Sequence, residues 1–195
     1  MTTSELRLFV AVELGDGVRK ALADLQDNLR RRGLERLRWV RGEGIHLTLK
    51  FLGDTPEEMV PRIGEALSGA VTGSRRHRLS LGRIGTFGGR RPRVLWVDLT
   101  GDIEEVVSLQ NAMETELSQL GFKREKRKFS PHLTLARVRP ETSAEMAEPI
   151  RTAIESARAP DTEVLVREVA LIRSTLGPSG AVYNRLTSAE LPGLD

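Results

Sequence analysis

The chain has 195 residues, of which 39% are hydrophobic and 29% are charged, and its formal net charge is +3. This balance is that of an ordinary globular domain. Because there is no cysteine, the sequence excludes disulfide frameworks, cysteine-based zinc sites and a cysteine nucleophile. No apolar stretch is long enough to span a membrane, and the first residues do not resemble a signal peptide, so we expect a monomeric cytoplasmic protein.

The first half of the chain predicts alternating strands and helices. Asp16 has the position of an N-cap for the first helix. Thr55 and Glu58 have the spacing of a capping box at the start of the second helix. The expected elements are a strand over 6–13, a helix over 16–32, a strand over 45–52, a helix beginning near 55, and strands over 79–84 and 94–99.

The second half repeats this order of elements. Asp102 is placed to cap a helix, and Gly121 is placed to end it. After that helix the expected elements are a strand over 132–138, a helix over 143–157, and strands over 164–172 and 181–186.

A shift of 86 residues places Asp16 on Asp102 and His46 on His132. The repetition predicts a single bilobal domain over 1–195, with internal repeats at about 16–100 and 102–187. The expected fold class is α+β. Two antiparallel or mixed sheets should face each other across a central cleft, with helices on the outer faces.

Positive charge is concentrated in four short segments. Such clusters can steer a polyanion such as nucleic acid, although any one of them is also typical of a solvated loop. His77 lies within one cluster, and we expect it at the surface. The four segments are RRR at 30–32, RRHR at 75–78, RRPR at 90–93 and KREKRK at 123–128.

The tetrapeptide HLTL occurs twice, and it contains two of the three histidines of the chain. Side chains alternate between the faces of a strand. His46 and Thr48 therefore share one face in the first copy, and His132 and Thr134 share one face in the second. The leucines of each copy anchor the strand to a hydrophobic layer.

Two imidazoles and two hydroxyls suit phosphodiester transfer. In-line displacement at phosphorus needs a base on the attacking oxygen and an acid on the leaving oxygen. Histidine can fill either role, because its ordinary pKa of about 6.5 lies near neutrality. The hydroxyls of Thr48 and Thr134 can donate hydrogen bonds to the non-bridging oxygens.

Two other uses of these residues remain open. A buried strand can contain HLTL without any chemistry, but two copies at equivalent points of a repeated plan favour a site. A metal would need further ligands, and no acidic residue lies on the predicted histidine and threonine faces. There is also no Walker loop and no dinucleotide fingerprint, so we expect neither a metal nor a cofactor.

At these motifs the chain resembles the two-histidine phosphoesterases, in particular the RNA 2′,3′-cyclic phosphodiesterases, also called 2′-5′ RNA ligases. The resemblance covers nearly the whole chain. The segments that carry it are RLFVAVEL, WVRGEGIHLTLKFLG, PRVLWVDL, FSPHLTLARV and LIRSTLGPSGAVY.

The resemblance implies a bilobal α+β fold and metal-free hydrolysis of a 2′,3′-cyclic phosphate to a 2′-phosphate. It implies that His132 activates water as the general base and that His46 protonates the departing O3′ as the general acid. Thr48 and Thr134 would bind the phosphate. Arg137 matches a family arginine at the substrate site, and Phe51 holds the equivalent place in the first copy.

Strict alternation conflicts with two of these roles. It places Phe51 and Arg137 on the faces opposite the histidines, so either strand would need a bulge or a twist after its second leucine. Phe51 is equally well explained as a core residue. Lys50 falls on the His46 face in this pattern, where it could meet a phosphate further along the RNA, but we expect an ordinary surface lysine.

Three hypotheses follow for the function. The first is a metal-independent enzyme acting on RNA with 2′,3′-cyclic phosphate ends, with ATP-independent 2′-5′ ligation as the reverse-type reaction. The second is a related phosphodiesterase for a small cyclic nucleotide or an ADP-ribose cyclic phosphate. The third is a non-catalytic RNA-binding protein, against which both intact HLTL copies count.

Overall fold

The computed structural model describes residues 4–177 and 180–193, which form nine strands and four α-helices joined by short helical turns. The helices are α1 (Asp16–Leu29), α2 (Val60–Val71), α3 (Ile103–Gln119) and α4 (Ala147–Ser156). The strands are β1 (Glu5–Glu13), β2 (Arg38–Trp39), β3 (His46–Pro56), β4 (His77–Phe87), β5 (Val94–Gly101), β6 (His132–Arg137), β7 (Glu163–Val166), β8 (Glu168–Gly177) and β9 (Gly180–Glu190).

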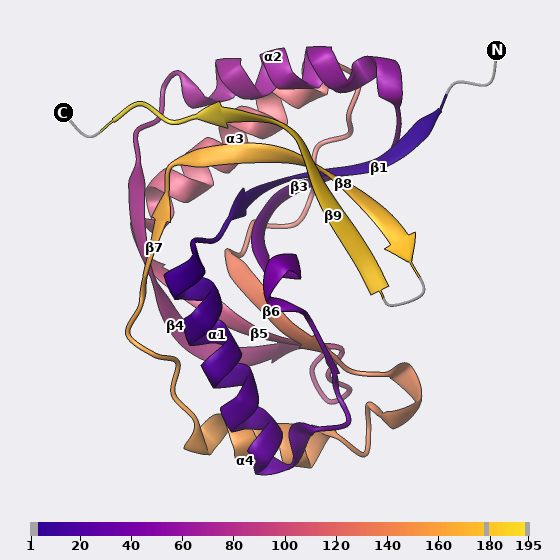
Figure 1. Cartoon of the computed structure of the whole chain (residues 1–195), viewed down its shortest axis with the longest axis vertical. Helices are drawn as coiled ribbons and strands as arrows, with labels where there is room; N and C mark the ends of the chain where they lie inside the picture. The colour runs from indigo at the N-terminus through magenta and orange to yellow at the C-terminus, as the bar shows by residue number, and fades with distance from the viewer. Residues whose placement is uncertain (1–3, 178–179, 194–195) are drawn as a thin grey trace.

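All the strands belong to one curved sheet, as Figure 1 shows. Its order is β7-β4-β5-β6-β3-β1-β8-β9, with β2 paired to β6, and the pairings are antiparallel. The predicted α+β class is confirmed. The prediction of two separate sheets is wrong, because β3 and β6 pair with each other and join the strands β7-β4-β5-β6 to the strands β3-β1-β8-β9. Each of these two groups contains strands from both halves of the sequence.

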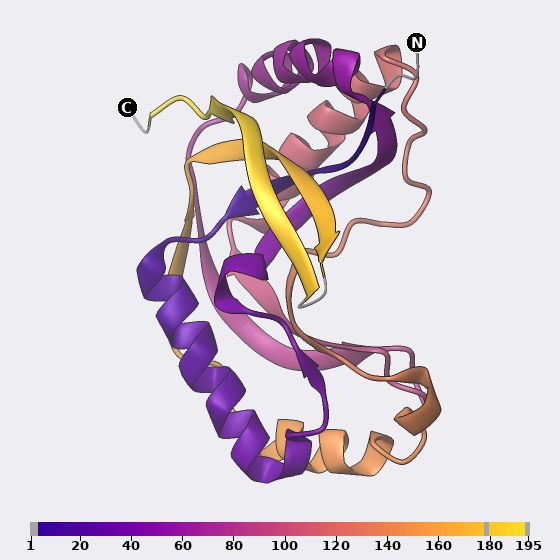
Figure 2. The same cartoon turned by 45° about the vertical axis from the view of Figure 1, so that its right-hand side comes forward.

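The helices form two groups at opposite ends of the molecule. Figures 1 and 2 both place α2 beside α3 at one end and α1 beside α4 at the other. Each helix buries one stripe of apolar residues against the sheet, as the sequence periodicity predicts. In α1 this stripe consists of Val18, Leu22, Leu25 and Leu29.

The sheet buries both of its faces at its centre. The main hydrophobic core contains Leu8 and Val10 of β1 together with the leucines of both HLTL copies. A second, smaller cluster on the other face of β1 consists of Phe9, Ala11, Ala170 and Ile172, with Tyr183 packed against it. Phe9 and Tyr183 of this smaller cluster pack against the ring of His46.

Several predicted helix starts differ from the structure. Gly15 is the N-cap of α1, and Asp16 is the first helical residue. Thr55 is buried near the end of β3, where its hydroxyl donates to the carbonyl of Gly53, so it is not part of a capping box. Ser143 lies before α4 and donates to the carbonyl of Pro92. The hydroxyl of Ser143 thus bonds a carbonyl 51 residues away, which local sequence does not reveal, whereas that of Thr55 bonds within its own strand.

Two further predictions are corrected. The strand expected over 164–172 is divided at Arg167 into β7, which is one edge of the sheet path, and β8, which lies next to the other edge strand, β9. His77, expected at the surface, is only 1% exposed, because it begins β4 and pairs with Val166 of β7. Burial lowers the pKa of His77, and Nε2 has no hydrogen-bond partner among the described residues. Within 4–177 and 180–193, no helix has the length and apolarity needed to cross a bilayer.

Candidate active site

The two HLTL copies lie side by side at the middle of the sheet. β3 and β6 are antiparallel neighbours, with Leu47 opposite Leu133. This register places His46 across from Thr134 and His132 across from Thr48 on one face, which we call the histidine face. Diagonal neighbours in an antiparallel pair lie about 7–8 Å apart. Two imidazoles at that separation can contact opposite sides of one phosphate.

A bulge in each histidine strand resolves the conflict over Phe51 and Arg137. Thr48 pairs with Ala11 and Lys50 with Val10, so Leu49 is the extra residue in β3. In β6 the corresponding extra residue is Leu135, because Thr134 pairs with Trp96 and Ala136 with Leu95. Each bulge reverses the alternation that follows it.

After these bulges both predicted substrate contacts lie on the histidine face. Phe51 is 73% exposed, with its ring centroid 6.0 Å from that of Phe9, so its interpretation as a core residue is wrong. Arg137 is exposed at the end of β6, and its charge acts on His46. The same shift turns Lys50 to the opposite face, where it is buried instead of exposed.

Two buried glutamines hold the bulged backbone. The side chain of Gln26 on α1 donates to the carbonyl of Leu135 at 2.9 Å. The side chain of Gln110 on α3 donates to the carbonyl of Leu49 at 3.5 Å. The carbonyl of Leu135 also accepts from the backbone N–H of Val40 at 2.9 Å, so the amide of Gln26 supplies a second donor there. These glutamines therefore stabilise the backbone that places Phe51 and Arg137.

His46 lies in an aromatic setting. Its ring stacks on Phe9 at 4.7 Å between centroids and meets the edge of Tyr183 at 5.3 Å. Burial among these rings, together with the nearby positive charge of Arg137, lowers the pKa of His46 to about 4. The imidazole is therefore neutral at pH 7 in the free protein.

This pKa predicts a loss of stability in acid. The unfolded chain binds a proton at His46 near pH 6.5, whereas the folded protein binds it only near pH 4. The free energy of unfolding should therefore fall as the pH drops between these values, by on the order of 3 kcal/mol at most. Urea unfolding at several pH values, compared with a His46→Phe variant, isolates this contribution from that of His77. An NMR titration giving His46 an ordinary pKa would contradict the prediction.

His132 is oriented by the backbone. Its Nδ1 lies 2.7 Å from the carbonyl oxygen of Ser130. Because a carbonyl oxygen only accepts, Nδ1 carries the proton and Nε2 of the neutral ring is free to accept one. Phe87 packs its ring edge-to-face with His132 at 4.9 Å. This arrangement is that of a general base held in one tautomer.

The structure thus brings all six predicted site residues to one face. Thr48 and Thr134 are half-buried, each across from a histidine of the neighbouring strand. Within 4–177 and 180–193, no group of three or more histidine, aspartate or glutamate side chains is arranged to hold a metal ion. A hollow of about 490 Å³ between α2 and β9 contains none of the six residues.

The sequence did not indicate which residues surround the imidazoles, although Tyr183 lies in LIRSTLGPSGAVY, one of the family-like segments. Phe9 and Tyr183 contact His46, and Phe87 and the carbonyl of Ser130 contact His132. One signal was available, because Phe9 falls on the face of β1 opposite Leu8 and Val10. The others come from distant strands and turns, and their proximity depends on the sheet order.

Comparison with known proteins agrees with this geometry. The model of the 2′-5′ RNA ligase superfamily matches residues 19–178. An RNA 2′,3′-cyclic phosphodiesterase of Thermotoga maritima is 31% identical over 96% of this chain and 97% of its own length. One from Methanothermobacter thermautotrophicus is 33% identical over 92% of this chain and 95% of its own. A crystal structure from Thermus thermophilus superposes with a TM-score of 0.76 at 30% identity, covering 96% of this chain and 98% of that one. The chain therefore belongs to the 2′-5′ RNA ligase superfamily.

Proposed function

We propose that the protein is a metal-independent RNA 2′,3′-cyclic phosphodiesterase that converts a cyclic phosphate end to a 2′-phosphate. The observation that carries the proposal is the placement of His46 and His132 on one face of adjacent strands, each beside a threonine. The name shared by the relatives from Thermotoga and Methanothermobacter supports the same reaction.

In the proposed reaction His132 is the general base. Its free Nε2 takes a proton from water as the water oxygen bonds to phosphorus. The bond from phosphorus to O3′ breaks, and His46 gives a proton to that oxygen. The hydroxyls of Thr48 and Thr134 donate to the non-bridging oxygens, where negative charge is concentrated.

Two residues beyond the bulges complete the proposed site. The guanidinium of Arg137 binds the phosphate or stacks on a base, and the ring of Phe51 stacks on a nucleobase. The exposure of Phe51 supports this role, since an apolar ring left 73% accessible on the histidine face is available to a ligand.

His46 needs a proton before it can act as the acid. In the free protein its pKa of about 4 leaves it neutral. A bound phosphodiester brings a negative charge close to the ring. This charge opposes the positive charge of Arg137 and so raises the pKa of His46. Substrate binding therefore shifts His46 towards the protonated form that a general acid requires.

The test is hydrolysis of an RNA oligonucleotide ending in a 2′,3′-cyclic phosphate, with EDTA present. We expect turnover, a product with a 2′-phosphate and a bell-shaped pH profile. A 3′-phosphate product would reverse the roles of the two ester oxygens. Turnover that requires added Mg²⁺ or Zn²⁺ would contradict a reaction driven by the two histidines alone.

The same centre can run in the direction of bond formation. Joining a 2′,3′-cyclic phosphate to a 5′-hydroxyl end uses the same acid and base in the same roles: His132 takes the proton of the 5′-hydroxyl, which attacks phosphorus in place of water, and His46 protonates the departing O3′. The superfamily description supports ligation as a second activity. Small cyclic-phosphate nucleotides should also be substrates, because the proposed catalytic groups contact only the terminal nucleotide.

We propose that the protein acts as a monomer in the cytoplasm. Size-exclusion chromatography tests whether it is a monomer.

A further inference from the structure

The segment between α3 and β6 carries more basic residues than any of the other three basic clusters. Residues 123–128, with the sequence KREKRK, contain five basic side chains and one acidic side chain, and all six residues are exposed. We call this segment the basic loop. Figure 2 shows the chain following the side of the molecule from the end of α3 towards β6.

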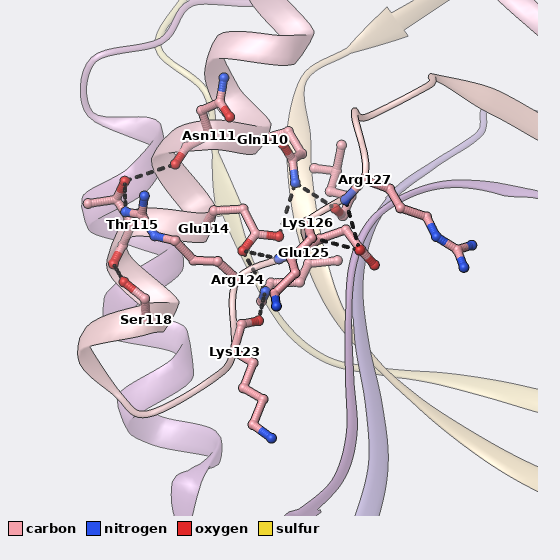
Figure 3. A network of polar contacts seen from close by, with 12 residues as sticks. Gln110, Asn111, Glu114, Thr115, Ser118, Lys123, Arg124, Glu125, Lys126 and Arg127 are labelled. Atoms are coloured by element: carbon pink, nitrogen blue, oxygen red, sulfur yellow. Dashed lines mark hydrogen bonds and ion pairs between the residues drawn. The ribbon is translucent and has the colours of Figure 1, made fainter.

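The basic loop is fixed at its start by a buried ion pair. Lys50 of β3 and Glu114 of α3 lie 2.6 Å apart, with only 4% and 7% of their side chains exposed. The ammonium of Lys50 also donates to the carbonyl of Lys123 at 2.8 Å, and Glu114 accepts from the backbone N–H of Glu125 at 3.2 Å. Figure 3 shows this network joining strand, helix and loop.

The acidic residue of the loop forms no ion pair with the basic side chains beside it, all of which the structure describes. The carboxylate of Glu125 accepts from the backbone N–H groups of Lys126 and Arg127 at 2.8 and 3.1 Å, and these bonds lower its pKa. Among the described residues, no carboxylate forms an ion pair with the five basic side chains. In Figure 3 the side chains of Lys123 and Arg127 extend away from the network.

Two other basic clusters, at 30–32 and 75–78, contain arginines that pair with carboxylates or pack on an aromatic ring. Arg30 pairs with Asp27 and lies over the ring of Trp39 at 4.7 Å. Arg78 pairs with Glu163 at 3.3 Å. The arginines of the 90–93 cluster are exposed and, like the side chains of the basic loop, form no ion pair among the described residues. The basic loop is the larger of these two unpaired clusters, with five basic side chains against three, and its backbone is anchored, which is an arrangement that suits an anion.

The loop also leads directly into the catalytic centre. His132 follows Lys128 by four positions, so their Cα atoms lie at most about 14 Å apart. Ser130 lies between them and orients His132 through its carbonyl. The loop is therefore tied to both histidine strands, through Lys50 on β3 and through Ser130 next to β6.

We propose that the basic loop binds the backbone phosphates of a single RNA strand whose 2′,3′-cyclic end occupies the histidine face. This inference rests on the proposed function and extends it, because it makes a polynucleotide a better substrate than a mononucleotide. A single strand carries one phosphate per nucleotide, and free lysine and arginine side chains neutralise such charges without reading sequence.

The experiment compares the parent protein with the triple variant Lys126→Ala, Arg127→Ala, Lys128→Ala. Two measurements are made: kinetics on a cyclic-phosphate oligonucleotide and on 2′,3′-cyclic AMP, and binding of an oligonucleotide that ends in a 2′-phosphate over a series of KCl concentrations. We expect a KM about tenfold higher for the oligonucleotide, with its kcat and both constants for cyclic AMP unchanged. The slope of log Kd against log[KCl] should become shallower by about 2, since each phosphate contact on a single strand contributes about 0.7.

A charge-matched control separates local contact from net charge. The variant Lys20→Ala, Arg31→Ala, Arg62→Ala also removes three positive charges, from residues exposed on α1, α2 and the turn after α1. It should keep the parent KM and salt slope. Equal effects of the two triple variants, or an unchanged KM and salt slope in the loop variant, would overturn the proposal.

Failure of the catalytic proposal gives a different pattern. If the parent hydrolyses neither substrate, the proposed function is wrong, but the binding measurement still tests the loop. If the loop variant loses hydrolysis of cyclic AMP as well, the loop supports the catalytic groups themselves, and the RNA-binding proposal is overturned.

Discussion

Replacing either His46 or His132 with alanine should lower kcat for cyclic-phosphate hydrolysis by at least ~100-fold, the lower end of the usual contribution of one acid or base. His132→Ala removes the only proposed proton acceptor for water. His46→Ala leaves O3′ to depart as an alkoxide. Because the two groups act in one step, the double variant should be little worse than the poorer single variant.

The third histidine provides the matched control. His77 is buried at the start of β4 and takes no part in the proposed chemistry. His77→Gln keeps a polar side chain there and should retain kcat within about twofold once thermal unfolding shows that the variant is folded. Single-turnover rates on the cyclic-phosphate oligonucleotide give the comparison. Near-parental rates in either His46→Ala or His132→Ala would end the acid–base assignment.

Glu114→Ala should give the largest loss of stability among single substitutions outside the hydrophobic core. It leaves the buried ammonium of Lys50 without its carboxylate, and removing one partner of a buried ion pair typically costs about 3–5 kcal/mol. It also removes acceptors for the side chain of Gln110 and for the backbone N–H of Glu125. Urea unfolding at pH 7 measures the change in the free energy of unfolding.

Two further variants show whether burial is the cause. Arg151→Ala removes two exposed ion pairs on α4, with Glu148 and Glu155, and should cost at most about 1 kcal/mol. The double variant Lys50→Met, Glu114→Leu replaces both buried charges by apolar groups and should recover much of the stability lost in Glu114→Ala. A loss in Glu114→Ala no larger than that in Arg151→Ala would show that the pair contributes little.

Most of the fold could be predicted from the sequence because its elements are strongly periodic. The apolar stripe of α1 and the alternating residues of β3 and β6 specify type and approximate position. What could not be predicted depends on contacts distant in the chain. Whether the strands form two sheets or one is decided by the pairing of Leu47 with Leu133, which no local pattern encodes.

In the site, too, the features marked by local sequence could be predicted, and those set by distant contacts could not. His46 and His132 could be identified because a repeated motif marks them. Lys50 was misplaced because alternation assumes a regular strand, whereas Leu49 bulges out of the ladder. The buried donors and acceptors that hold this irregular backbone, Gln110 and Glu114, lie on α3, about sixty residues away along the chain. A single polar residue on a helix face gives no signal of such a partner.

The pairing of β3 with β6 also has a consequence for folding. Leu47 and Leu133 are 86 residues apart, and β1 on the far side of β3 pairs with β8, whose partner residues lie still later in the chain. Contacts so distant in sequence close large loops and form slowly. Neither HLTL copy meets its partner during synthesis until most of the polypeptide has been made. Recovery of enzymatic turnover during refolding should therefore trail the appearance of helical signal, and its rate reports the closing of the sheet at its centre.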